Sequence, residues 1–204
     1  LNQLKHIRLV MVIPLFPLSM CLLPHGFSQL RIFEPRYKRL VTESLKTNSG
    51  FGLCMLSDDK KQMLPIGTLC KIIDFQTLDD GLLGITIKGE RKFHLKDFIV
   101  EPDGLKRGTI ELIDDWPKSL INLTESQKMS QIQATAKMLS DTLRDILHQY
   151  PEHLAQYQNE HFADISWVCQ RWLEIIPLSA AEKYHCINNH DHKMAQNYLS
   201  NIIK

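Results

Sequence analysis

The first helix that the sequence predicts begins within the stretch Leu30-Arg-Ile-Phe-Glu-Pro-Arg-Tyr37. Proline suits a first helical position, because its fixed φ matches the helix and its missing N–H has no partner there, so we expect a helix from Pro35. Gly50 can take the left-handed conformation that ends a helix. The apolar residues between them recur at helical spacing: Tyr37, Leu40, Val41 and Leu45.

Short apolar runs on both sides of this helix indicate strands. We predict strands over residues 8–15, 51–56, 67–78, 83–95 and 109–113. Asp79-Asp80-Gly81 is typical of a tight hairpin turn, and Gly89 predicts a bulge or bend in the strand that follows. Several strands around one helix predict a small, closed or nearly closed β-barrel over residues 1–116.

Residues 117–204 contain no glycine and predict a helical bundle. Thr124-x-x-Gln127 and Ser179-x-x-Glu182 fit capping boxes, which satisfy free amides at helix starts. Apolar stripes at helical spacing run through residues 129–146, 165–176 and 194–202, with Pro151 and Pro177 expected to end the first two. The predicted class is therefore α+β, with subdomains at 1–116 and 117–204.

The charge balance argues against a protein whose main task is to coat nucleic acid. The 204 residues include 24 basic and 23 acidic side chains, a net charge of +1. Five scattered cysteines form no CxxC pair, which favours buried thiols in a reducing compartment. The apolar run at 9–18 is interrupted by Pro14 and Pro17, so we expect no membrane span and a cytoplasmic protein.

The sequence has no motif typical of nucleotide or hydrolase chemistry. It lacks a GxxxxGK[ST] loop, a GxGxxG turn, a GxSxG elbow and an HExxH pair, so we expect no catalytic residues and no cofactor. One cluster contains metal-ligating residue types: His185, Cys186, His190 and His192. Its spacing matches no standard zinc site, and we interpret these histidines as solvated loop residues.

Several motifs together resemble the N-terminal domain of the ATP-dependent Lon protease. They are Ile13-Pro-Leu-Phe-Pro-Leu18, Leu23-Pro-His-Gly26, residues 30–37, Pro65-Ile-Gly67-Thr68, Gly89-Glu-Arg-Lys-Phe93 and Ile176-Pro-Leu-Ser-Ala-Ala-Glu-Lys183. The resemblance covers about residues 7–203. It implies a PUA-like β-barrel with one intervening helix, followed by a C-terminal α-helical bundle.

The same resemblance implies a non-catalytic module that helps to recruit unfolded or tagged protein segments. The family's ATPase and peptidase modules do not fit within this length, so we expect a stand-alone protein that resembles the domain, with a separate protease or chaperone as a further partner. Arg91 keeps the family's Gly-x-Arg pattern, although Lys92 adds a charge beside it.

The candidate peptide-binding residues lie mostly in the proline-rich loop and at the helix start: Pro24, His25, Phe27, Phe33, Glu34, Arg36, Arg91 and Trp167. Pro24-His25-Gly26 predicts a turn that projects Phe27 outward, as an apolar anchor near Glu34 and Arg36. The alternative is that Phe27 and Phe33 seal the barrel. Trp167 and Trp172 lie five residues apart and cannot share one narrow helical stripe, so we expect one in the core and one exposed. An exposed tryptophan can contact a partner, and Trp167 is the candidate for this role.

Two other functions remain open at this point. PUA-like barrels also occur in RNA-modifying proteins, although the neutral charge balance and the lack of an aromatic and basic stretch count against RNA binding. A small-molecule enzyme or ligand binder could use the cleft between barrel and bundle, which a cluster of perturbed pKa values in a pocket would support.

Overall fold

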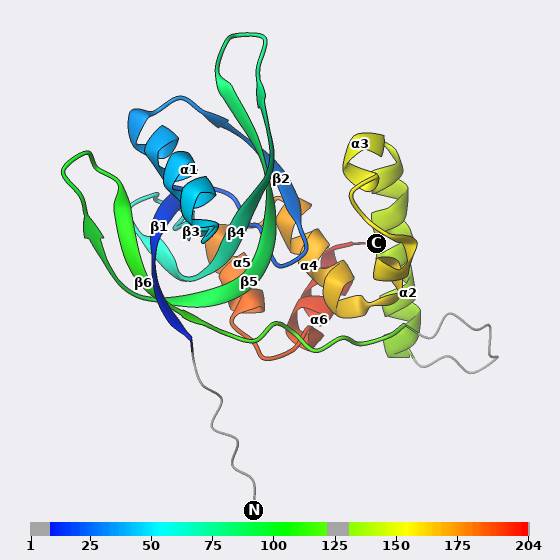
Figure 1. Ribbon diagram of the computed structural model, residues 1–204. Helices are drawn as coiled ribbons and strands as arrows, with labels where there is room; N and C mark the ends of the chain where they lie inside the picture. The colour runs from blue at the N-terminus through cyan, green and yellow to red at the C-terminus, as the bar shows by residue number, and fades with distance from the viewer. Residues whose placement is uncertain (1–8, 122–130, 204) are drawn as a thin grey trace, which may run out of the picture.

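The strands of the N-terminal half close into a ring (Figure 1). The computed structural model describes residues 9–121 and 131–203. The strands are β1 (Val10–Leu18), β2 (Phe27–Ile32), β3 (Phe51–Leu56), β4 (Met63–Thr77), β5 (Leu83–Val100) and β6 (Lys106–Leu112). Their order is β2-β5-β4-β3-β1-β6, and β6 also pairs with β5, which completes the ring.

The long strand β5 makes this closure possible. Its first part pairs with β2 and its last part pairs with β6, while β4 runs along its other edge. The register with β4 shifts next to Gly89, which confirms the predicted bulge. Among the described residues β2 pairs with β5 only, so it is an edge strand.

Helix α1 (Pro35–Thr47) covers one side of the ring, as Figure 1 shows. Pro35 occupies the first turn, and Asn48 ends the helix in the left-handed region at φ 50°. Leu40 and Val41 are buried against apolar residues of the strands, including Phe16. The prediction of a helix from Pro35 is confirmed, although Leu45 is 48% exposed and lies outside the buried stripe.

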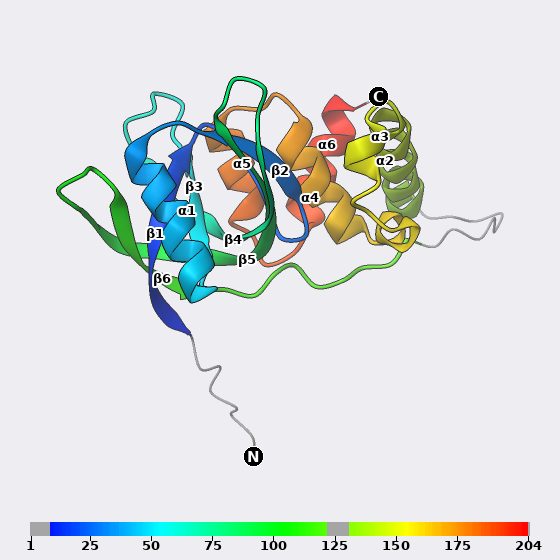
Figure 2. The same ribbon diagram turned by 45° about the horizontal axis from the view of Figure 1, so that its top comes forward.

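The C-terminal half is helical, as predicted. Its helices are α2 (Gln131–His148), α3 (Pro151–Leu154), α4 (Ile165–Ile175), α5 (Ala180–Ile187) and α6 (Lys193–Ile202), with a 3₁₀ turn η1 (Asn159–Ala163). Helix α4 is central, because its residues 165–173 are all buried (Figure 2). The α+β architecture, with one helix among the strands and helices at the C-terminus, is thus confirmed.

One apolar core joins the two halves. Cys21, Leu23, Met55 and Ile66 of the ring pack into the same cluster as Trp116 and the buried faces of α2, α4, α5 and α6. Burial of apolar surface is the main stabilising contribution to folding, so this shared core fixes the helices to the ring.

Several local predictions have definite outcomes. Ser179 and Glu182 form the expected capping box. Thr124-x-x-Gln127 lies outside the described residues. The helix α2 ends at His148, and Pro151 starts the short helix α3 rather than simply ending α2. Ile132 is 69% exposed and Ile146 is half-buried, so the buried apolar residues of α2 are Ala136, Leu139, Leu143 and Leu147.

The sequence analysis did not predict β2. Leu30 and Ile32 are buried and Arg31 is exposed, which is the period-two signal of a strand with one buried face. No helix within the described ranges has the length and hydropathy that a membrane crossing requires.

All five cysteines are buried and unpaired. Burial raises the pKa of the Cys21 and Cys54 thiols to about 12, so at neutral pH they stay protonated and behave as small apolar residues.

Candidate functional site

The predicted site residues lie on separate parts of the surface. Phe33, Glu34 and Arg36 line one groove together. Phe27 lines a second hollow, Arg91 a third, and His25 and Trp167 a fourth. The structure therefore brings only three of the eight candidates into one groove.

The loop before β2 connects the ring to α4. The carboxylate of Glu174 accepts a hydrogen bond from the Leu23 N–H at 2.7 Å, and Arg171 donates to the Pro24 carbonyl oxygen at 2.8 Å. Arg171 and Glu174 form an ion pair at 2.8 Å, with side chains only 2% and 9% exposed. Both members of this pair bind backbone groups of the loop, so the pair holds the loop in one position. Loss of either partner would leave an uncompensated buried charge.

Two glycines allow the loop to approach its neighbours closely. A Cβ on Gly26 would collide with the Glu174 carboxylate, and a Cβ on Gly89 would collide with the Leu23 carbonyl oxygen. The Gly89 N–H also donates to the Gly26 carbonyl oxygen at 2.9 Å. Pro24 is consequently buried, while His25 is exposed with φ 64°.

Phe27 lies at this junction and does not project freely. It is half-buried, and its ring centroid lies 5.6 Å from that of Tyr157 in the helical half. Its ring packs against the shared core. Phe27, which the sequence predicted to project outward as an anchor, thus makes a structural contact with the helical half.

Phe33, Glu34 and Arg36 line a groove at the N-terminus of α1, which we call the α1 groove. It has a volume of about 640 Å³. Its apolar and aromatic lining comprises Phe16, Pro17, Leu18, Phe33, Tyr37, Leu56, Met63 and Phe98, and its polar lining comprises Arg31, Glu34, Arg36, Lys60, Lys61, Gln62 and Lys106. The groove thus lies among α1, β1 and β2, the β3–β4 connection and the β5–β6 hairpin.

Aromatic rings form both the floor and the walls of the α1 groove. Phe16 is buried and stacks on Tyr37, with ring centroids 4.0 Å apart. Phe33 is 63% exposed and Phe98 is 42% exposed, and both line the groove from different elements. Two exposed aromatic rings beside one cleft are an unusual surface for a folded protein, and such surfaces commonly bind other molecules.

A network of ion pairs holds the β5–β6 hairpin against α1. Arg39 of α1 pairs with Glu101, and Arg107 of β6 pairs with Glu101 at 2.7 Å and with Glu43 of α1 at 2.8 Å. Hydrogen bonds from Arg107 and Arg39 lower the pKa of Glu101 to about 2. The network fixes the distance between the helix and the hairpin that carries Phe98.

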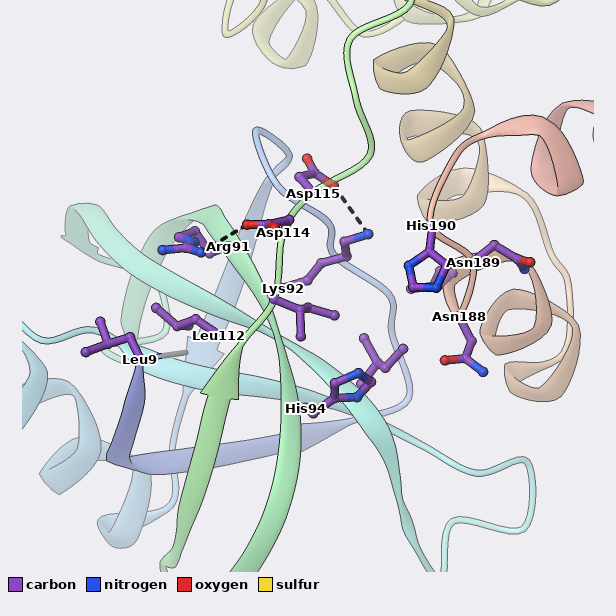
Figure 3. Close-up of a pocket in the computed structure, with 13 residues that line it drawn as sticks. Leu9, Arg91, Lys92, His94, Leu112, Asp114, Asp115, Asn188, Asn189 and His190 are labelled. Atoms are coloured by element: carbon purple, nitrogen blue, oxygen red, sulfur yellow. Dashed lines mark ion pairs between the residues drawn. The ribbon is translucent and has the colours of Figure 1, made fainter. Parts of the chain in front are cut away.

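Arg91 lies in a different hollow, of about 400 Å³, between the ring and the α5–α6 connection (Figure 3). Its guanidinium faces Asp114 at 3.9 Å, and the neighbouring Lys92 points toward Asp115 at 3.4 Å. The Lys92 side chain is 2% exposed, and burial lowers its pKa while Asp115 opposes that shift. Asn188 and His190 face the same hollow from the helical half.

The expectation that one of the two tryptophans is exposed is wrong. Trp167 and Trp172 are each 4% exposed. Trp172 donates to the Leu139 carbonyl oxygen at 2.9 Å, and Trp167 packs edge-on against Tyr157 at 5.0 Å. Helix α4 is surrounded on all sides, so residues outside one narrow stripe are also buried.

The interpretation of these histidines as solvated loop residues holds for His190 and needs a correction for the other two. His185 is exposed but lies within helix α5. His192, immediately before α6, is buried, and its Nδ1 lies 3.0 Å from the hydroxyl of Ser166 in α4. Cys186 is buried in α5. Within residues 9–121 and 131–203, no three His, Cys, Asp or Glu side chains gather as metal ligands would.

Comparisons with known proteins agree with this architecture. Residues 12–193 match the family described as the ATP-dependent protease La (LON) substrate-binding domain. The chain belongs to this family. The resemblance stated from the motifs is thereby confirmed, and with it the prediction of a substrate-binding module.

Solved structures support the assignment. A Lon N-terminal domain protein from Xanthomonas campestris is 26% identical, with a TM-score of 0.69 over 93% of this chain and 96% of that chain. The N-terminal domain of a Mycobacterium avium complex Lon protease is 14% identical, with a TM-score of 0.62 over 94% and 97%, and it supports the fold alone. No curated protein sequence matches the chain at a significant level. The family does not favour the RNA-binding or small-molecule alternatives.

The sequence analysis missed several residues of the α1 groove: Phe98, Lys60, Lys61 and Lys106. These residues lie in the β3–β4 connection and the β5–β6 hairpin, which come close to α1 only when the ring of strands closes. A signal for the hairpin was present, because Pro102-Asp103-Gly104 is a strong turn sequence, and Gly104 adopts φ 84°.

Proposed function

We propose that this member of the Lon substrate-binding family binds exposed apolar segments of unfolded or tagged proteins in the α1 groove. The observation that carries the proposal is the pair of exposed rings, Phe33 and Phe98, on the walls of one groove of about 640 Å³. Aromatic residues dominate the binding energy of many protein interfaces, because they remove a large apolar area from water.

The groove suits an extended segment with a few apolar anchors. Burying a whole apolar side chain contributes about 1.5–3 kcal/mol, so two or three such anchors give useful but reversible binding. Reversible binding is what a module that recruits many different chains requires. Tyr37 and Phe16 provide the apolar floor against which an inserted side chain would pack.

The test is the affinity for fluorescently labelled casein, an unstructured protein, measured by anisotropy. Phe33→Ala should weaken binding by about 1–2 kcal/mol, because the variant removes one aromatic wall. Phe75→Ala is the matched control: Phe75 is 65% exposed, against 63% for Phe33, and does not line the groove. Equal losses in both variants, or no loss in Phe33→Ala, would contradict the proposal.

We also propose that the chain acts in the cytoplasm and has no catalysis of its own, as the missing nucleotide and hydrolase motifs and the unpaired cysteines suggest. The purified protein should neither hydrolyse ATP nor cleave casein. The measurements are phosphate release and gel electrophoresis after prolonged incubation. ATPase or protease activity that copurifies strictly with the chain would overturn this part of the proposal.

A further inference from the structure

We infer that the α1 groove selects apolar segments that are flanked by acidic side chains. This inference rests on the proposed function and adds the charge of the substrate to it. The groove is lined by five basic side chains, Arg31, Arg36, Lys60, Lys61 and Lys106, and by one acidic side chain, Glu34. An excess of positive charge beside apolar anchors determines which segments bind and in which register they lie.

Two of the five basic side chains have no carboxylate partner among residues 9–121 and 131–203. The other three are paired: Arg36 with Glu34 at 2.6 Å, Arg31 with Asp80, and Lys61 with Asp59 at 3.9 Å. Lys60 and Lys106 have no carboxylate partner in the part of the chain that the structure describes. The Lys106 ammonium lies 5.9 Å from the ring centroid of Phe98, so a free cation stands next to an apolar anchor.

The excess of positive charge is specific to this groove and is not a property of the whole surface. The protein has a net charge of only +1. The hollow of about 730 Å³ between β2, β4 and α3 also contains aromatic side chains, Phe27 and Tyr150, but its lining carboxylates are Asp74 and Glu152. A segment with acidic flanks therefore fits the α1 groove and is repelled from the other hollow.

The expected selectivity is modest. Exposed ion pairs each change an equilibrium by a small factor, so two or three of them should favour acidic flanks over neutral ones by about 3- to 10-fold. Salt screens such pairs, so this preference should fall as ionic strength rises.

The experiment uses three labelled peptides with the same apolar centre and with aspartate, serine or lysine flanks. Anisotropy titrations of the full chain at about 50 and about 300 mM NaCl give the three affinities and their salt dependence. We expect the order aspartate, serine, lysine at low salt, with the differences reduced at high salt. Phe33→Ala should weaken all three peptides.

A charge reversal locates the effect. Lys60→Glu/Lys106→Glu should abolish or invert the preference while the serine peptide still binds. The matched control, Lys46→Glu/Lys193→Glu, makes the same change in net charge at two exposed lysines outside the groove and should keep the preference. Unfolding curves of both variants show that the fold is retained.

The outcomes separate this inference from the proposed function. If all three peptides bind equally and Phe33→Ala weakens them, this inference is wrong and the proposed function stands. If no peptide binds, both fail. A third outcome would also overturn this inference: a labelled single-stranded RNA competes with the aspartate peptide and loses affinity in Lys60→Glu/Lys106→Glu. The basic groove would then bind nucleic acid.

Discussion

Phe27 shows how one side chain can connect two halves of a fold. Its ring packs against Tyr157 of the helical half, and the Lys88 ammonium lies 5.8 Å from its centroid. The loop before it is held by Glu174 and Arg171 of α4. The position of this ring is thus determined by contacts that are distant in sequence.

Phe27→Ala should therefore lower the free energy of unfolding by about 1–3 kcal/mol, less than for a fully buried ring because Phe27 is half-buried. The measurement is the urea midpoint followed by circular dichroism. Phe75→Ala, at an exposed position of the same residue type, should change stability by less than about 0.5 kcal/mol. Unchanged stability with weakened casein binding would restore Phe27 as a substrate anchor.

At the scale of elements, a network of charged side chains joins α1 to the β5–β6 hairpin. Glu101 accepts hydrogen bonds from Arg107 and from Arg39, and its side chain is 20% exposed. The pKa of this carboxylate falls from 4.5 to about 2 in the folded protein. A depressed acid pKa stabilises the folded state above the unfolded pKa, and the contribution is lost as the pH falls through the folded pKa.

We expect Glu101→Gln to lower stability by about 1 kcal/mol near neutral pH, since water weakens partly exposed ion pairs. The variant should also lose less stability than the wild type as the pH falls from 4.5 to about 2. Urea midpoints across that pH range measure both effects. Glu152→Gln, at an exposed glutamate, is the control, and a parallel acid decline in Glu101→Gln and wild type would disprove the role of the network.

At the scale of the whole molecule, the ring and the helices share one apolar core. The cluster that contains Cys21, Leu23, Met55 and Ile66 is completed by α2, α4, α5 and α6. Asp58, between β3 and β4, also accepts a hydrogen bond from the Ala180 N–H at 2.7 Å and so caps α5 from outside the helical half.

The subdomain boundary at 116/117 can be tested directly. A fragment of residues 1–116 would expose the ring side of the shared core, so it should show no cooperative urea transition. The full chain should unfold in a single transition when followed by circular dichroism and by tryptophan fluorescence. A fragment with a sharp transition near the midpoint of the full chain would establish residues 1–116 as an independent domain.

Features that depend on neighbouring residues could be predicted from the sequence. Pro35 starts α1, Asp79-Asp80-Gly81 turns the chain between β4 and β5, and Ser179 with Glu182 caps α5, because each device acts through backbone groups within a few residues. The motifs around residues 13–37 identified the family for the same reason, since a short string can be read without the fold.

Which side chains meet depends on how the strands and helices pack together. Phe33 and Phe98 are 65 positions apart in sequence, and ring closure through β6 brings them to one groove. Trp167 could not be placed from helical periodicity, because the burial of a residue on α4 depends on every element that packs around it. Spacing along the chain specifies a helix face, whereas distances between strands and helices depend on how the shared core packs.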